Sequence, residues 1–330
     1  MRALVPLLPT LILSLLPAAA RPETFPTLRL ASWNLEWLVS AATTQAARRD
    51  CLAGRHAALP CDTALDAGRS SADYASLARY ARELDADVIA VQEVEDAATA
   101  ARVFPGYAFC LSVRNLTQKP GFAIRAGLRF RCGPDYDVLA LDGHGRPGVQ
   151  LVVDPGGPRE LHLLAVHLKS GCATAALETP TMACRQVARQ LPAVGAWMQS
   201  QRQAGHRHVV LGDFNRSWDT DSGRTLELLA GGQEGPLPFD IPEASTGFIS
   251  CFPGQTFTRY IDHLLVGHGG GLFTEPSNFY RVRFKPADVR HYHLSDHCPV
   301  GVVLRFTAAP DWHTRSTVQP TASERPASSR

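Results

Sequence analysis

Seven short runs of apolar and β-branched residues recur along the chain, and each is bounded by turn residues. Runs of this length and composition are typical of strands that are buried in a sheet. The chain is therefore expected to be built around one or more sheets. The runs cover residues 28–33, 87–92, 149–153, 160–167, 208–212, 261–266 and 299–306.

Two stretches between these runs have the spacing of amphipathic helices. Residues 72–84 and 182–203 each place apolar side chains on one face. Pro192 lies inside the second stretch and predicts a kink or a break there. Strands that alternate with helices favour an α/β protein whose sheets are covered by helices. Residues 51–71 and 231–254 are rich in turn residues and are expected to form long loops.

The composition fits one large folded domain rather than a disordered chain. Of the 330 residues, 45% are hydrophobic and 19% are charged, which is enough apolar material for a large core. The formal net charge is only +2, whereas proteins that bind nucleic acids through their overall charge usually carry a clear basic excess. An anionic substrate must therefore be attracted locally.

The N-terminus has the residue order of a secretory signal peptide. Residues 1–20 run from a basic start at Arg2 through an uncharged apolar stretch to small residues that end at Ala20. The alternative is a transmembrane anchor, since the uncharged stretch approaches the ~18 residues at which spanning becomes feasible. Three prolines would interrupt such a helix, so cleavage after Ala20 is favoured. We expect a secreted or periplasmic protein without a membrane anchor after processing.

The chain divides into four parts on this basis. Residues 1–20 are the signal peptide, and residues 21–27 are a short lead-in. Residues 28–307 form the folded domain. Residues 308–330 are rich in Pro, Ser, Thr and Ala without apolar periodicity, which predicts a disordered tail.

Eight cysteines follow the expected cleavage site. An even number of cysteines in an exported chain indicates disulfides, because the compartment beyond the inner membrane is oxidising. A structural zinc site is the alternative, but the closely spaced cysteine pairs that such sites use are missing from the sequence. The count alone does not choose among the many possible pairings. The cysteines are Cys51, Cys61, Cys110, Cys132, Cys172, Cys184, Cys251 and Cys298.

Polar or acidic residues stand at the ends of the predicted strands in six places. In a packed α/β domain the strand ends gather at one edge, where loops carry function on a rigid scaffold. The carboxylates in these segments are therefore expected to converge. The segments are residues 32–36, 92–93, 167–170, 212–215, 261–263 and 295–297.

These residue types suit the hydrolysis of a phosphate ester. A hard cation neutralises charge on the phosphoryl oxygens, and Mg²⁺ takes carboxylate oxygens such as those of Glu36, Glu93 and Asp296. Attack by water also needs a proton acceptor or orienting group and donors for the phosphate. The candidates for these roles are His167, Asp213, Asn215 and His297.

Taken singly, each of these motif residues could have a structural role, such as a turn or helix cap. For His263 the structural role is the better interpretation. Taken in order over residues 28–306, they resemble the endonuclease/exonuclease/phosphatase superfamily. The resemblance implies a four-layer α/β sandwich of two packed mixed β-sheets flanked by helices, with the site at the sheet ends. The motifs that carry it are Trp33-Asn34-x-Glu36, Gln92-Glu93, His167, Gly212-Asp213-Phe214-Asn215, Asp262 and Ser295-Asp296-His297.

The resemblance also implies a metal site and a role for each matching residue. Glu93 would be the chief ligand of Mg²⁺ or Mn²⁺, supported by Asn34, Glu36 and Asp296.

The remaining motif residues would handle the substrate and the attacking water. His297, paired with Asp262, would act as base or orienter of the water. A competing assignment makes Asp213 the base and leaves His297 to bind phosphate. Two cations in the same segments, Lys169 and Arg216, are expected to bind substrate. The residues implied to contact the attacked phosphate or its water are His167, Asp213 and Asn215.

The disulfides are expected to join cysteines that are neighbours in sequence, because small loops close at low entropic cost. For the most widely separated pair, the resemblance places the flanking strands side by side. That pair would brace the loop that carries Asp296 and His297. The predicted pairs are Cys51–Cys61, Cys110–Cys132, Cys172–Cys184 and Cys251–Cys298.

The leading function is an exported Mg²⁺- or Mn²⁺-dependent phosphodiesterase, a nuclease on DNA or RNA that works as a monomer. A sphingomyelinase-like or other lipid or small-molecule phosphodiesterase is the alternative within the same class. A non-catalytic binding protein on the same fold is the alternative from another class, and it should have lost motif residues that this chain retains. An open basic surface around the site would indicate a nucleic acid, and an apolar edge a membrane. Seven cations could form a local basic patch, or could equally be ordinary solvated surface charges. They are Arg125, Arg129, Arg131, Arg216, Arg281, Arg283 and Lys285.

Overall fold

The structure is a computed structural model that describes residues 27–306, apart from residues 67, 142, 144, 233, 234, 256 and 275–277. The expected signal peptide, the expected tail and all but the last residue of the lead-in lie outside the described residues. Those three expectations stay predictions.

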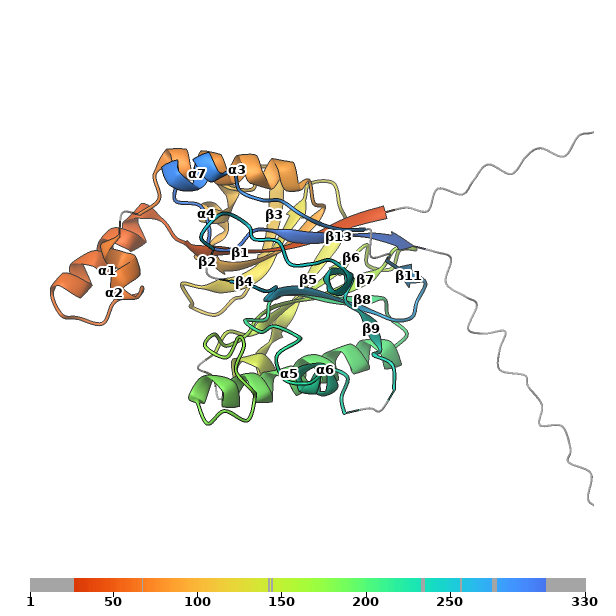
Figure 1. Cartoon of the computed structure of the whole chain (residues 1–330). Helices are drawn as coiled ribbons and strands as arrows, with labels where there is room; N and C mark the ends of the chain where they lie inside the picture. Colours follow the sequence, from red (N-terminus) through yellow and green to blue (C-terminus); the bar gives the residue numbers. More distant parts are fainter. Residues whose placement is uncertain are drawn as a thin grey trace, which may run out of the picture.

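Two packed β-sheets form the centre of the molecule (Figure 1). In the first sheet the strand order is β11-β13-β1-β2-β4-β3, with β12 also paired to β13. The central strands β1 and β2 are parallel, whereas β13 runs antiparallel to β1. Its strands are β1 (Thr27–Leu38), β2 (Val88–Val94), β3 (Tyr107–Leu111), β4 (Lys119–Arg125), β11 (Leu272–Phe273), β12 (Phe279–Arg281) and β13 (Val300–Phe306).

The second sheet has the strand order β5-β6-β7-β8-β10-β9 and the same mixture of directions. Its central strands β7 and β8 are parallel, and β10 runs antiparallel to β8. Its strands are β5 (Phe130–Tyr136), β6 (Gly148–Val153), β7 (Leu161–His167), β8 (His208–Asp213), β9 (Phe239–Asp240) and β10 (Asp262–Gly267).

Helices cover the outer face of each sheet, which makes four layers (Figure 1). One apolar core fills the space between the two sheets, a second lies between the first sheet and α3, and a third between the second sheet and α5. The predicted four-layer α/β sandwich is confirmed. The helices are α1 (Ala41–Leu52), α2 (Cys61–Leu65), α3 (Ser71–Leu84), α4 (Ala97–Ala101), α5 (Met182–Gln203), α6 (Arg224–Leu229) and α7 (Pro286–His291), with short 3-10 helices at Asp137–Ala140 and Pro242–Ser245.

All seven runs predicted as strands form strands, with ends that shift by a few residues. The predictions for residues 28–33, 87–92 and 208–212, for example, correspond to β1, β2 and β8. Strands β3 and β5 were missed because they lie at the edges of their sheets and are only partly buried, so their sequences lack a continuous apolar run.

The helix α5 has the predicted bounds but does not break at Pro192. A proline inside a helix costs about 3 kcal/mol. In α5 this cost is offset by the burial of Val187, Leu191 and Val194 against the second sheet. The prediction of a long loop over residues 51–71 is also wrong in part, because α2 lies inside it.

The structure contains the four predicted disulfides, Cys51–Cys61, Cys110–Cys132, Cys172–Cys184 and Cys251–Cys298. The first of them ties α1 to α2, and these two helices share a small apolar core of their own. Together they form a projection at one end of the sandwich (Figure 1). Within the described residues, no helix is long and apolar enough to cross a membrane.

Candidate active site

The predicted site residues converge because the strands that carry them end at one edge of the sandwich. The parallel pair β1 and β2 delivers Asn34 beside Gln92, and the parallel pair β7 and β8 delivers His167 beside Asp213. The antiparallel strand β10 begins where β8 ends, so Asp262 lies opposite Asp213. Strand β13 likewise begins at the end of β1, which brings the preceding loop to the same place.

Gly212 allows the two central strands of the second sheet to approach each other at this edge. A Cβ atom at this position would lie 2.0 Å from the carbonyl oxygen of Val166 on β7. Its φ of 150° is also unfavourable for a side chain. Glycine is therefore needed directly before Asp213.

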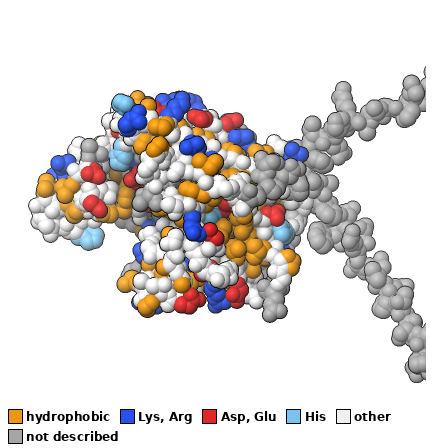
Figure 2. All heavy atoms as spheres, viewed as in Figure 1, with side chains coloured by type: hydrophobic (Ala, Val, Ile, Leu, Met, Phe, Trp, Pro, Cys, Tyr) orange, Lys and Arg blue, Asp and Glu red, His pale blue; other side chains and the backbone are white. Residues whose placement is uncertain are grey.

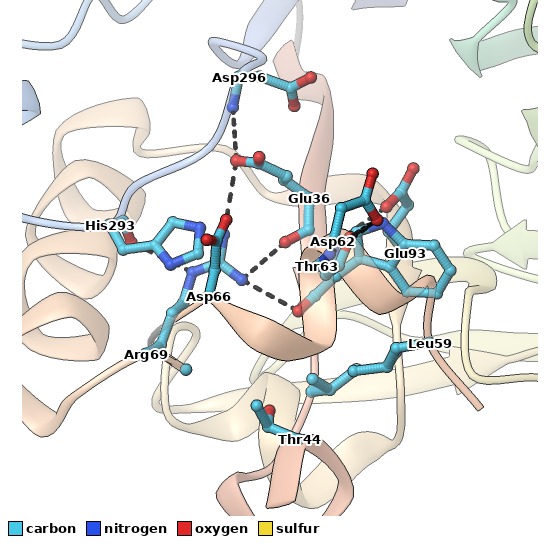
Figure 3. Close-up of a pocket in the computed structure, with 13 residues that line it drawn as sticks. Glu36, Thr44, Leu59, Asp62, Thr63, Asp66, Arg69, Glu93, His293 and Asp296 are labelled. Atoms are coloured by element: carbon cyan, nitrogen blue, oxygen red, sulfur yellow. Dashed lines mark hydrogen bonds and ion pairs between the residues drawn. The ribbon is translucent and has the colours of Figure 1, made fainter. Parts of the chain in front are cut away.

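Carboxylates from three elements meet on one side of the site. The Asn34 side-chain amide donates to Glu93 Oε1 at 3.2 Å, and the Trp37 backbone nitrogen donates to Glu93 Oε2 at 3.0 Å. Glu36 Oε2 accepts from the backbone nitrogen of Asp296 at 3.0 Å, as Figure 3 shows. The four residues predicted to hold a metal are thus brought together.

Four residues at the site have a left-handed backbone. Glu36, Trp37, Glu93 and Asn215 have φ values of 46°, 50°, 62° and 50°. This conformation is unfavourable for residues other than glycine and persists only where the surroundings fix it. At the ends of β1, β2 and β8 it turns the chain so that the polar side chains face one another.

His297 and Asp262 form a close buried pair. The Nδ1 atom of His297 lies 2.6 Å from Asp262 Oδ2, and its Nε2 atom lies 3.9 Å from Asp213 Oδ2. Burial alone lowers the pKa of His297, but the charges of Asp262 and Asp213 outweigh burial and raise this pKa well above its ordinary value. The two carboxylates therefore favour the protonated, imidazolium form of His297.

Asp213 occupies the centre of the polar cluster. Its Oδ2 atom accepts from the side-chain amides of Asn34 and Asn215, each at 3.0 Å, and its Oδ1 atom accepts from the backbone nitrogen of Asn215 at 2.7 Å. Burial raises the pKa of Asp213 to about 7, although the charge of His297 opposes this shift. The carboxylate is thus both firmly oriented and able to exchange a proton near neutral pH.

His167 faces the same cluster as a neutral imidazole. Its Nε2 atom lies 3.5 Å from Asp213 Oδ2 and 3.7 Å from Glu93 Oε1. Burial, followed by the charge of Arg146, lowers the pKa of His167 well below its ordinary value. Arg146 also donates from Nε to the His167 carbonyl oxygen and from an Nη atom to that of Leu168, which fixes this strand end.

Two open pockets flank the polar cluster. The first, of about 290 Å³, is acidic and is lined by Glu36, Glu93 and Asp296 together with Asp62 and Asp66 of the α2 region (Figure 3). The second, of about 450 Å³, mixes cationic, neutral polar and apolar groups. Its lining includes Lys169, Arg146, Gln186, Leu116 and Met182. Trp37 and the projection of α1 and α2 contribute to both pockets.

The acidic side fits a hard divalent cation. Burial and the charge of Asp296 raise the pKa of Glu36 to about 7, and burial also raises the pKa of Asp296. A cation placed among these oxygens would relieve both effects. Glu36, Glu93, Asn34 and Asp296 offer oxygen ligands only, which is the donor set that Mg²⁺ and Mn²⁺ prefer.

A second candidate metal cluster consists of Asp213, Asp262 and His297, whose ligand atoms lie within 4.8 Å of one another. The protonated ring of His297 already supplies the positive charge between these two carboxylates. The Glu36 side is therefore the better candidate for a cation, and the His297 side for a proton.

A match to a family model shows which family this chain belongs to. The model of the endonuclease/exonuclease/phosphatase family matches residues 31–297, which span the site from β1 to His297. The chain belongs to this family. Members of the family are hydrolases of phosphate esters and generally use a divalent metal, so the chain is a phosphoesterase of this family.

Solved structures of the family share this fold. A truncated Caenorhabditis elegans TDP2 is 15% identical, with 85% of this chain and 98% of that chain covered and a TM-score of 0.52. A Bacteroides vulgatus family protein is 14% identical, with 86% of this chain and 100% of that chain covered and a TM-score of 0.53. A Bacteroides thetaiotaomicron mannosyl-6-phosphatase is 17% identical, with 84% of this chain and 100% of that chain covered and a TM-score of 0.51. No curated protein matches the chain.

One predicted substrate-binding residue of this family member, Arg216, lies in the core instead. Its side chain is fully buried and donates to Thr225 Oγ1 at 3.0 Å, to the Cys172 carbonyl oxygen at 2.7 Å and to Asp221 Oδ2 at 2.6 Å. A fully buried side chain with these partners does not reach the site edge, so the substrate-binding prediction for Arg216 is wrong. The guanidinium instead anchors the loop that follows Asn215.

Replacing Arg216 with Met should therefore destabilise the protein rather than impair binding. The change leaves the buried carboxylate of Asp221 without its partner, which typically costs about 3–5 kcal/mol. Urea unfolding of Arg216→Met should show this loss. Lys169→Met is the matched control at the site and should lower activity with little effect on stability. A stable but inactive Arg216→Met would contradict the structural role.

The seven cations that could form a basic patch do not gather in one place, since Arg281 and Arg283 donate to the carbonyl oxygens of Ile249 and Ser250. Arg125 and Arg129 pair with Asp85 and Asp154 at the sheet edge away from the site, near the starts of the parallel strands. On the face that Figure 2 shows, basic and acidic side chains are interspersed. Local cations near the site are instead Lys169 and Arg146.

Three site residues were missed by sequence reasoning. Arg146 lies in a loop before β6 without a motif around it, and no local signal indicates its contact with the His167 strand end. Arg69 precedes α3 and donates to the carbonyl oxygens of Glu36 and His293. It thereby links the end of β1 to the loop that carries Asp296. Trp37 directly follows the Glu36 motif, and this adjacency is the one signal that was available.

Proposed function

We propose that this family member is an exported, metal-dependent phosphodiesterase and that its substrate is a nucleic-acid strand. The observation that carries the catalytic part is the arrangement of Asp213, an oriented carboxylate with a pKa near neutrality, opposite His297, a buried imidazolium. Such a pair provides a proton acceptor and a positive charge side by side, where both can face one reacting phosphate.

Asp213 is proposed as the base. Water attacks phosphorus and forms the new P–O bond, its proton moves to Asp213 Oδ2, and the ester bond opposite breaks. The amides of Asn34 and Asn215 hold this carboxylate in one orientation. Sequence reasoning favoured His297 as base or orienter, but a ring that already carries its proton cannot accept another, so the competing assignment of the base to Asp213 is preferred.

His297 is proposed to stabilise the charge that develops on the phosphate, and His167 to contact a phosphoryl oxygen from the other side. The negative charge of Asp262 keeps the ring of His297 protonated and fixed. The departing oxygen becomes an alcohol by taking a proton from water. A divalent cation held by Glu36, Glu93, Asn34 and Asp296 supplies further positive charge for the phosphoryl oxygens when it is bound.

The charge balance of the site supports a diester over a monoester. Before a cation binds, the carboxylates at the reacting region slightly outnumber its cations, which are His297, Arg69, Arg146 and Lys169. The carboxylates are Glu36, Glu93, Asp213, Asp262 and Asp296. A diester carries less negative charge than a monoester and is repelled less by this surplus of carboxylates.

The second pocket supports a nucleotide on one side of the phosphate. Trp37 offers an aromatic ring, Gln186 and Gln190 offer polar groups, and Lys169 offers a positive charge. Rings and cations of this kind bind single strands by stacking and charge. Among the described residues on the face that Figure 2 shows, basic side chains do not form a wide surface, which disfavours duplex DNA and favours a flexible strand.

A lipid or other small-molecule phosphodiesterase is the second candidate. It is favoured by apolar residues near the second pocket: Met182 is 67% exposed and lines the pocket, while Leu116 and Leu141 contribute further apolar surface. An apolar rim is a feature of membrane-facing sites.

Parallel assays on the mature protein distinguish these substrates. We expect Mg²⁺-dependent cleavage of single-stranded oligonucleotides and RNA, slower cleavage of plasmid DNA, and little release of phosphate from a simple aryl monoester. Hydrolysis of sphingomyelin vesicles in preference to every nucleic acid would replace the nuclease proposal with the lipid one. Preference for the monoester would overturn the diester assignment.

Export predicts that the mature chain begins at Arg21. The four disulfides support an oxidising compartment, in which such bonds form and persist. N-terminal sequencing of protein from the medium or the periplasm should give Arg21 as the first residue. An intact Met1 in a membrane fraction would contradict processing.

A further inference from the structure

A cluster of two histidines and a glutamate lies at the opposite end of the second sheet from the catalytic residues. His162 stands near the start of β7, and His206 stands in the connection from α5 to β8. Five positions along β7 separate His162 from His167, which corresponds to about 17 Å of strand. The cluster is therefore outside the phosphoesterase site.

The three side chains already lie close together. The Nε2 atom of His162 is 2.9 Å from Glu160 Oε1, and the rings of His162 and His206 stack with their centres 3.9 Å apart. One ligand atom from each residue lies within 4.8 Å of the other two. All three residues are partly exposed, so an ion from solvent can reach them.

We propose that Glu160, His162 and His206 form a binding site for a borderline divalent metal ion such as Zn²⁺. Two histidines and one carboxylate, with water in the fourth position, are a known zinc donor set. The ion would replace the proton that His162 and Glu160 now share. Metal–ligand bonds of roughly 2.0–2.2 Å place the ligand atoms of a tetrahedral site about 3.4 Å apart, so the side chains would rotate to point at one ion.

Neighbouring groups hold the ligands in the form that binds metal. The Nδ1 atom of His206 lies 3.0 Å from Gln201 Oε1, so Nδ1 carries the proton and Nε2 keeps its lone pair for a metal. The backbone nitrogen of Gly156 donates to Glu160 Oε2, which orients this carboxylate and leaves Oε1 facing His162. A neutral imidazole and an ionised carboxylate are the ligating forms.

The expected consequence of binding is mechanical. The ion would join the start of β7 to the chain that enters β8, where the His162 backbone nitrogen already donates to the Arg207 carbonyl oxygen at 2.9 Å. A ligand that binds only the folded state raises its stability. Zn²⁺ should therefore raise the melting temperature without being needed for hydrolysis.

The test uses the mature chain with Mg²⁺ in excess and a Glu93→Gln, His297→Ala background, so that neither cluster at the catalytic edge competes for zinc. Calorimetric titration should give one Zn²⁺ per chain, and Co²⁺ in its place should give the visible absorption of a tetrahedral site. His206→Ala and Glu160→Gln should each weaken Zn²⁺ binding by more than about tenfold, the lower bound for loss of an outer-shell partner.

His268→Ala is the matched control, because His268 is half exposed and pairs with a carboxylate, Asp240, in the same way. It should leave Zn²⁺ affinity, Co²⁺ absorption and the zinc-induced rise in melting temperature unchanged. With Glu93 and His297 intact, His206→Ala should retain Mg²⁺-dependent hydrolysis. Zinc binding that survives both His206→Ala and Glu160→Gln, or that is absent from the parent protein, would overturn the proposal.

Discussion

His297→Ala should lower turnover by roughly 10²–10⁴-fold, the range typical of losing one group that assists proton transfer or charge stabilisation. The pH profile should change with it. Activity requires ionised Asp213 and protonated His297, so it should rise as pH passes about 7 and fall again as pH passes the raised pKa of His297. The mutant should lack the alkaline fall. Turnover measured against pH in both proteins tests this.

The acidic limb should also move in His297→Ala. The positive charge of His297 lowers the pKa of Asp213, so its removal should shift the acidic limb to higher pH. Asp262→Asn is the matched variant, since it keeps the shape but removes a negative charge that raises the pKa of both groups. Both limbs should then move to lower pH. Loss of the acidic limb in His297→Ala would instead identify His297 as the base.

Glu93→Gln should abolish most activity together with metal binding. The substitution keeps the shape but removes the negative charge that holds a hard cation beside Asn34 and Glu36. Removing a residue that only hydrogen-bonds to a metal ligand typically lowers metal affinity by about 10–100-fold. Loss of the charged ligand itself should therefore lower metal affinity at least as much. Titration with Mn²⁺ and assays over a range of Mg²⁺ concentrations measure both effects.

Glu95→Gln is the control for Glu93→Gln. Glu95 lies two residues further along, accepts from the Ser40 backbone nitrogen and the Thr43 hydroxyl, and does not line the acidic pocket. It should leave metal affinity and turnover close to those of the parent protein. Tight Mn²⁺ binding with normal turnover in Glu93→Gln would place the metal elsewhere.

Strand positions and the order of the site residues could be predicted from the sequence because these features are local. An apolar run such as 208–212 needs only its own composition to form a buried strand, and the polar residues after it must then lie at a strand end. The capping and spacing signals of α5 are equally local. Disulfides between neighbouring cysteines follow from short loops.

The charge states and the burial of individual side chains were decided only by the tertiary structure. The protonated form of His297 is favoured because Asp262, 35 residues earlier, lies 2.6 Å away. The buried Arg216 side chain donates a hydrogen bond to the carbonyl oxygen of Cys172, 44 residues earlier. The sequence presents both as strand-end polar residues that suit a site. A pKa depends on dielectric and on charges within a few ångströms, and these are set by contacts between distant segments.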